Sequence, residues 1–129
     1  MLNVKKIHHI AMIVSDYSTS KQFYTKILGF KILNETYRQN KNSYKLDLLT
    51  EDGLQIELFS FPNPPKRVTN PEATGLRHLA FQVENIYDSV NFLKSKGISV
   101  EPVQIDPISG KRYTFFRDPD DLPLELYEE

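Results

Sequence analysis

The chain contains an internal repeat, and this repeat limits the possible folds more than any other feature of the sequence. The segment "HHIAMIVSDYSTSKQFYTKILGFKI", which starts at His8, aligns with "RHLAFQVENIYDSVNFLKSKGISV", which starts at Arg77. Each segment has the pattern of a strand, a helix and a turn at a glycine, Gly29 or Gly97. The later segments "DGLQIELF" and "DDLPLELY" align as well. We therefore expect two copies of one structural unit.

Each copy predicts a β-α-β-β-β unit, so the expected fold class is α+β. Module one covers about 5–61 and module two about 76–129, within one domain over 1–129. The connector, about 62–75, reads "PNPPKRVTNPEATG" and has the proline-rich composition of a linker. After the helices, the expected strands cover 31–37, 43–49, 54–59, 99–104, 112–117 and 122–127.

Both helices are predicted from apolar residues at helical spacing. The first should begin near Ser18 or Thr19, which are good capping residues, and should end at Gly29. The second should end at Gly97 and carry an apolar stripe of Ile86, Val90 and Leu93. Two helices cannot cover both faces of so many strands. One face of each sheet should therefore pack on its helix, and the other should line a cup.

The composition of the 129 residues excludes several classes of function. Sixteen basic and seventeen acidic residues nearly cancel, so charge predicts no nucleic-acid or membrane-surface partner. The absence of cysteine excludes disulfides, thiolate metal ligands and a cysteine nucleophile. The sequence has no signal-peptide pattern and no apolar run of membrane length. These observations predict a cytoplasmic protein.

Strand phase distinguishes the adjacent histidines His8 and His9. Alternate residues of a strand point to opposite faces, and we assign the more apolar face of each first strand to its helix. In module one that face carries Ile10, Met12 and Val14, and in module two it carries Leu79, Phe81 and Val83. His9 and His78 should then point into the cup. His8 is expected to be structural or exposed.

Two glutamates occupy matching positions in the last strand of each module. Glu57 follows His9 by 48 residues, and Glu125 follows His78 by 47. Both lie between apolar residues of opposite phase, so they should face the cup with the histidines. Buried carboxylates are costly unless they are paired or bound to a metal. A His₂Glu₂ set suits a divalent first-row metal with positions left for water or substrate.

Several stretches together resemble the vicinal oxygen chelate superfamily, in its glyoxalase I-like branch. They are "HHIAMIVSDYSTSKQFYTKILGF", "IELFSFP", "GLRHLAFQV" and "FFRDPDDLPLELYEE", and they span most of the chain. The resemblance implies paired βαβββ modules that form a metal-binding cup, and a homodimer. It assigns His9, Glu57, His78 and Glu125 as ligands of one divalent ion per site. Nickel, zinc or cobalt is expected, with manganese and iron as further options.

The resemblance also implies a chemistry, that of a lactoylglutathione lyase-like lyase or isomerase. The metal would hold two oxygens of a small substrate and stabilise an enediolate as a proton leaves the carbon beside a carbonyl. Glu57 or Glu125 would act as the base. The sequence leaves open which glutamate it is, which substrate is used, and whether the site forms within one chain or between two.

Two departures from the family pattern argue against glutathione dependence. Glutathione-using members carry an arginine four residues after the first histidine, where this chain has Ile13. They also carry an asparagine four residues after the first glutamate, where this chain has Phe61. A third departure, Asp121 in place of a common glycine, should be tolerated because aspartate adopts left-handed geometry better than most residues.

The sequence offers weaker candidates for substrate contacts and two alternative functions. The candidates are a basic rim with Arg77, a loop near Lys111 and Arg112, and the aromatic Phe61. Within enzymes, an extradiol-type dioxygenase or a thiol transferase is the alternative. In a different class, the chain is a non-catalytic small-molecule binding or resistance protein, although such binders usually lack the four ligands.

Overall fold

The computed structural model describes residues 1–129, which form two compact units, Met1–Lys66 and Arg67–Glu129. Each unit is built on one four-stranded mixed sheet, and each sheet has the same strand order. The predicted α+β class with two repeated modules is confirmed. The boundary between the units falls inside the predicted connector.

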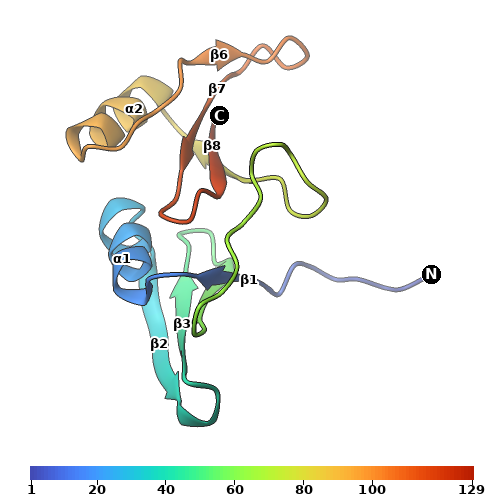
Figure 1. Cartoon of the computed structure of the whole chain (residues 1–129). Coiled ribbons are helices and arrows are strands. Elements are labelled where there is room, and N and C mark those ends of the chain that lie inside the picture. The colour runs from blue at the N-terminus through green and yellow to red at the C-terminus, as the bar shows by residue number, and fades with distance from the viewer. The chain divides into compact units, whose positions relative to one another are not determined.

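Unit one follows the predicted β-α-β-β-β order (Figure 1). Its elements are β1 (His9–Val14), α1 (Tyr17–Gln22), a π-helical turn η1 (Phe23–Ile27), β2 (Lys31–Arg38), a 3₁₀ turn η2 (Gln39–Lys41), β3 (Ser43–Leu49) and β4 (Gln55–Ser60). The sheet order is β1-β4-β3-β2. β1 pairs with β4 in parallel, and the other pairings are antiparallel.

Unit two repeats this arrangement. Its elements are β5 (Leu79–Val83), α2 (Ile86–Ser95), β6 (Gln104–Ile105), β7 (Arg112–Arg117) and β8 (Pro123–Glu128). The sheet order is β5-β8-β7-β6, and β5 pairs with β8 in parallel. The first and last strands of each module are therefore neighbours, which places the predicted histidine and glutamate positions side by side.

The first helix begins one turn-residue earlier than the sequence predicts. Its N-cap is Asp16, whose carboxylate accepts a hydrogen bond from the backbone N–H of Thr19 at 2.9 Å. Aspartate is as good a cap as serine, so Ser18 and Thr19 become part of the first turn. In the second helix Asn85 plays the same role toward the N–H of Asp88.

The predicted strand at 99–104 is wrong for most of its length. Only Gln104–Ile105 pairs with β7. Glu101 still bonds to β7, through its N–H to the Phe115 carbonyl and its carbonyl to the Thr114 hydroxyl. Pro102 follows with no N–H to donate, so the ladder is interrupted. The other five expected strands agree with the structure to within one residue.

The core of each unit lies between its helix and one face of its sheet, and the helices contact the last strands β4 and β8. In unit one, Leu46, Leu48, Ile56 and Leu58 have no exposed surface. In unit two, Ile86, Val90 and Leu93 of α2 pack with Phe116, Leu124 and Leu126. The opposite face of each sheet carries the polar and aromatic side chains and is called the open face below.

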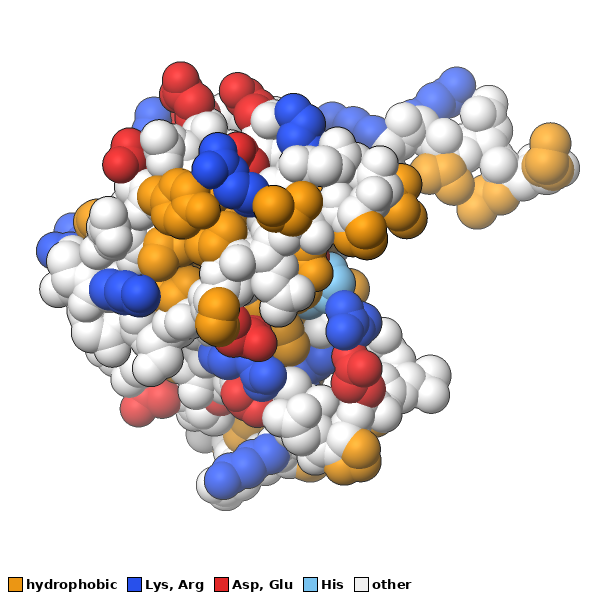
Figure 2. Space-filling view, turned by 90° about the horizontal axis from the view of Figure 1, so that it is seen from above, with side chains coloured by type: hydrophobic (Ala, Val, Ile, Leu, Met, Phe, Trp, Pro, Cys, Tyr) orange, Lys and Arg blue, Asp and Glu red, His pale blue; other side chains and the backbone are white.

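The residues before β1 form an extended segment with no regular structure. Met1, Leu2 and Val4 are all largely exposed, and Figure 2 shows apolar and basic side chains along this segment. No helix in the structure has both the length and the apolar character needed to cross a lipid bilayer.

Candidate metal and substrate site

The first histidine–glutamate pair lies on the open face of unit one. β1 and β4 run in parallel, with Ala11 paired to Glu57 and His9 one alternation earlier on the same face. The Nδ1 atom of His9 is 3.8 Å from the Oε2 atom of Glu57. The glutamate side chain is 8% exposed and the histidine 42% exposed. The small side chain of Ala11 leaves the glutamate accessible to the imidazole.

The second pair repeats this geometry on the open face of unit two. Ala80 pairs with Glu125, and His78 lies just before β5 on the same face. The Nε2 atom of His78 is 3.0 Å from the Oε2 atom of Glu125. The imidazole ring also meets the Phe115 ring edge to face, with centroids 5.1 Å apart.

Each pair has the donor chemistry of a metal site, an imidazole nitrogen next to a carboxylate oxygen. No group of three or more His, Asp or Glu side chains gathers within either unit. Each module therefore supplies half of the four-residue set that the sequence predicts. His8 lies outside both pairs: it is exposed, and its Nδ1 contacts Nδ1 of His9 at 2.9 Å.

The two glutamates have different surroundings. The side-chain amide of Gln55 donates to Oε2 of Glu57 at 2.8 Å, and the Lys45 ammonium lies 3.9 Å from its Oε1. Asp47 faces Glu57 from β3, and its Oδ1 is 3.5 Å from Lys45. Sequence reasoning missed these three polar neighbours, although their odd positions match the phase of Glu57.

The equivalent neighbours of Glu125 are less polar. Phe115 takes the position that Asp47 has in unit one, directly across the ladder from the glutamate. Pro123 takes the position of Gln55, and it has no side-chain donor. Glu125 is therefore held by His78 and walled by an aromatic ring, whereas Glu57 is fixed by an amide and an ammonium.

The structure separates the four weaker candidates for substrate contact. Phe61 stacks on Phe59, on the phase of Glu57, with the Arg38 guanidinium over both rings. Arg77 pairs with Glu72, and its Nη1 is 3.3 Å from His78. These positions keep Phe61 and Arg77 in the proposed site.

Lys111 and Arg112 are directed away from the histidine–glutamate pair. Lys111 is exposed and donates to the backbone carbonyl of Glu129 at 2.6 Å. Arg112 lies on the helix-packed face, where it bonds to the Glu128 carboxylate and covers the Tyr87 ring. Its even position, in phase with buried Thr114, indicated this face in the sequence. We leave both residues out of the proposed substrate site.

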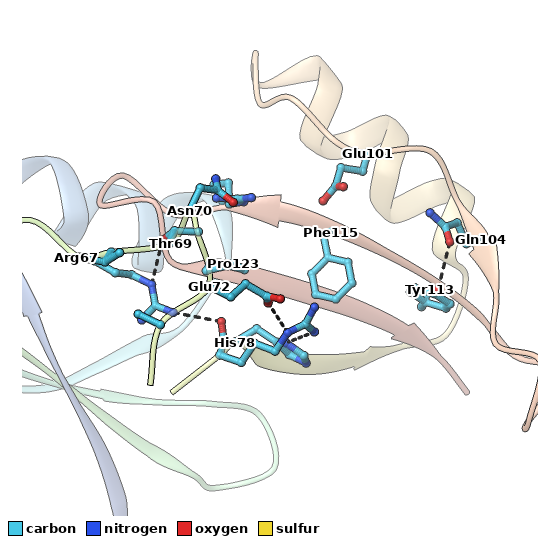
Figure 3. A pocket seen from close by; sticks show the side chains of 14 residues that line it. Arg67, Thr69, Asn70, Glu72, His78, Glu101, Gln104, Tyr113, Phe115 and Pro123 are labelled. Carbon is cyan, nitrogen blue, oxygen red and sulfur yellow. Dashed lines mark hydrogen bonds and ion pairs between the residues drawn. The ribbon is translucent and has the colours of Figure 1, made fainter. Parts of the chain in front are cut away.

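A pocket of about 360 Å³ opens beside His78 within unit two (Figure 3). One side comes from the connector, including Arg67, and the floor comes from the open face, including Phe115. This volume is at the small end of the range for ligand pockets. Sequence reasoning treated residues 67–75 as a plain linker, because loops carry no periodicity that reveals such a wall.

A family model described as the Glyoxalase/Bleomycin resistance protein/Dioxygenase superfamily matches residues 6–126. The chain belongs to this superfamily. It is 59% identical to the uncharacterized protein YwkD of Bacillus subtilis over 126 residues, which is 98% of each chain. It is 53% identical to the uncharacterized protein YaeR of Escherichia coli over the full length of both.

A solved structure, that of SMU.1112c, has the same fold with a TM-score of 0.91. It is 46% identical in sequence, and the match covers 98% of this chain and 100% of that one. More distant superfamily relatives carry enzyme names. The chain is 27% identical to the lactoylglutathione lyase of Schizosaccharomyces pombe, of which it covers 49%, and 27% identical to the metallothiol transferase FosB of Staphylococcus epidermidis, of which it covers 83%.

Proposed function

We propose that this protein is a divalent-metal-dependent lyase or isomerase that moves a proton beside the carbonyl of a small, oxygen-chelating substrate. One observation carries the proposal: the same histidine–glutamate pair recurs on the open face of both modules at equivalent ladder positions. Superfamily membership and the lyase among the relatives support it. The proposed ligands are His9, Glu57, His78 and Glu125.

A metal held by these residues would supply a Lewis acid that polarises the substrate carbonyl and acidifies the neighbouring C–H. His9 and His78 are then neutral donors that stay in place during turnover. One of the two glutamates takes the proton and returns it to the adjacent carbon. Phe61 offers an apolar contact for the rest of the substrate, and Ile13 replaces the arginine expected in a glutathione-using member.

The first experiment is elemental analysis of the purified protein, paired with a proton-exchange assay. We expect about one nickel, zinc, cobalt, manganese or iron ion for each set of four ligands, and solvent deuterium incorporated into α-hydroxycarbonyl substrates by the metal-loaded protein. Chelation should abolish exchange, and the same metal should restore it. Protein that takes up no divalent metal when any of these ions is supplied would refute the proposal.

A mixing experiment decides whether the two pairs that share a metal come from one chain or from two. Take His9→Ala and His78→Ala, each unable to bind metal alone, and unfold and refold them together. If two chains of a homodimer share each site, half of the heterodimer sites regain all four ligands, and metal binding returns. If each chain builds its own site, mixing restores nothing. We propose the homodimer with shared sites, as in many superfamily members.

A second candidate is a metal-dependent thiol transferase, favoured by the relationship to FosB over 98% of this chain. It uses the same four residues, so metal analysis does not separate it from the first. Loss of free thiol in the presence of an epoxide substrate, without deuterium exchange at carbon, would select the transferase. Exchange without thiol consumption would select the lyase or isomerase.

A further inference from the structure

The connector after Arg67 is folded as a wall over the open face of unit two. The Nε of Arg67 donates to the Thr69 hydroxyl at 3.0 Å, and its Nη2 donates to the carbonyls of Leu76 and Arg77 at 2.6 and 3.2 Å. Thr69 is buried and donates to the Asp121 carbonyl at 2.8 Å. One guanidinium thus ties both ends of the loop, which leads directly into His78.

The charges of the pocket beside His78 are unevenly neutralised. Arg77 forms an ion pair with Glu72, and Arg117 pairs with Asp121 at 2.9 Å. Arg67 is the exception among the arginines of the pocket, because all of its partners are neutral oxygens. Three of its five N–H groups are used, which leaves the Nη1 amino group without a protein partner.

One carboxylate opposes this positive charge at the other end of the pocket. The Glu101 side chain has no ion-pair partner, and Figure 3 shows it across the Phe115 ring from His78. Arg67 lies on the connector side instead. A negatively charged ligand is therefore attracted to the Arg67 end and repelled from the Glu101 end, which gives the pocket a direction.

We propose that this pocket binds an oxyanion group of the substrate, with Arg67 as its anchor. The group is a carboxylate, a phosphate or a phosphonate, since each presents oxygens to which a guanidinium donates short, charge-assisted hydrogen bonds. The inference deepens the proposed function, because His78 belongs both to the pocket and to the proposed ligand set. A substrate anchored at Arg67 would reach the reacting centre through its other oxygens.

The test uses metal-free protein, so that it does not depend on the proposed metal. Inorganic phosphate and malonate are titrated into chelated wild type, and binding is followed by calorimetry and by ¹H–¹⁵N spectra. We expect saturable binding of at least one of the two, with shifts at the amides of Thr69, His78 and Phe115. Arg67→Gln should weaken it about tenfold or more. Lys66→Gln, an exposed neighbour outside the pocket, removes the same charge and should leave binding unchanged.

Two further variants separate anchoring from loop support. Arg67→Lys keeps the charge but loses the fork, so it should bind more tightly than Arg67→Gln even though both loosen the loop. Glu101→Gln removes the opposing charge and should strengthen binding a few fold. Equal binding by wild type and Arg67→Gln, or no saturable binding of either anion, would overturn the inference. Neither result bears on metal uptake, which tests the proposed function by itself.

Discussion

The Nε2 atom of His78 lies 3.0 Å from the Oε2 atom of Glu125, and the corresponding atoms of His9 and Glu57 are 3.8 Å apart. Both contacts join the first strand of a module to its last strand, and both strand pairs are parallel. A parallel pairing places a residue at the start of one strand diagonally beside the middle of the other. The contact is therefore a consequence of the repeated topology, and it arises twice.

Removal of the second histidine should abolish metal binding. We expect His78→Ala to lower the affinity for nickel or zinc by about a hundredfold or more, because a nitrogen donor is lost and Glu125 loses its partner. Calorimetric titration of the metal into chelated protein measures this effect. His8→Ala is the matched control, since this exposed imidazole lies outside both pairs, and it should bind metal as the wild type does. Equal loss in both variants would contradict the assignment of the ligands.

The helix-ending glycines should tolerate substitution only at a cost in stability. Gly97 has a φ of +77° after α2, and an added Cβ would meet no atom within 4 Å. Gly97→Ala should therefore destabilise the protein by about 1 kcal/mol through backbone strain alone. Gly97→Asn should cost less, because asparagine adopts the left-handed region more readily. Urea unfolding of the three proteins gives the two differences, and an alanine variant at least as stable as asparagine would argue against strain.

The faces of the strands could be predicted because the pattern in each module is consistent at several positions. Val14 is buried, while Ile13 remains 60% exposed on the face of His9. Asp121 has a φ of +66°, so it holds the left-handed turn expected of it. These features depend on strand phase or on local backbone preference, and both are visible in a single sequence.

The surroundings of the two pairs could not be predicted in the same way. Lys45 and Asp47 approach Glu57 from β3, and contact across a sheet depends on register, which the sequence does not state. The wall built by Arg67 depends on hydrogen bonds to backbone carbonyls of a loop. Such bonds leave no mark in residue spacing, so the pocket appeared only with the structure.

The core of unit two should be sensitive to the loss of volume in its last strand. Leu124 of β8 has no exposed surface, so Leu124→Ala should lower the free energy of unfolding by about 2–5 kcal/mol. Leu33→Ala, at a residue of β2 that is 52% exposed, should change it by less than about 0.5 kcal/mol. Urea denaturation followed by circular dichroism compares them. Similar effects at both positions would show that the burial of Leu124 is wrong.

Part of the stability of unit two should depend on pH through Glu128. The Arg112 guanidinium donates to this carboxylate at 3.1 and 2.8 Å, and the N–H of Ile86 donates at 3.3 Å. The Arg112 hydrogen bonds, with help from Ile86 and against partial burial, hold the pKa of the Glu128 carboxyl below its ordinary value of 4.5. The folded protein therefore takes up this proton less readily than the unfolded chain does.

It follows that the stabilisation from Glu128 is fully present above pH 4.5 and is lost as the pH falls through the lower pKa of the folded state. Glu128→Gln should be less stable than wild type at pH 7, and the difference should shrink as the pH falls below 4.5. Urea unfolding at pH 7, 5, 4 and 3 follows it. Glu51→Gln, at an exposed turn residue, controls for the loss of one charge. A difference between Glu128→Gln and wild type that stays constant from pH 7 to pH 3 would mean that the bonds from Arg112 and Ile86 do not favour the ionised carboxylate.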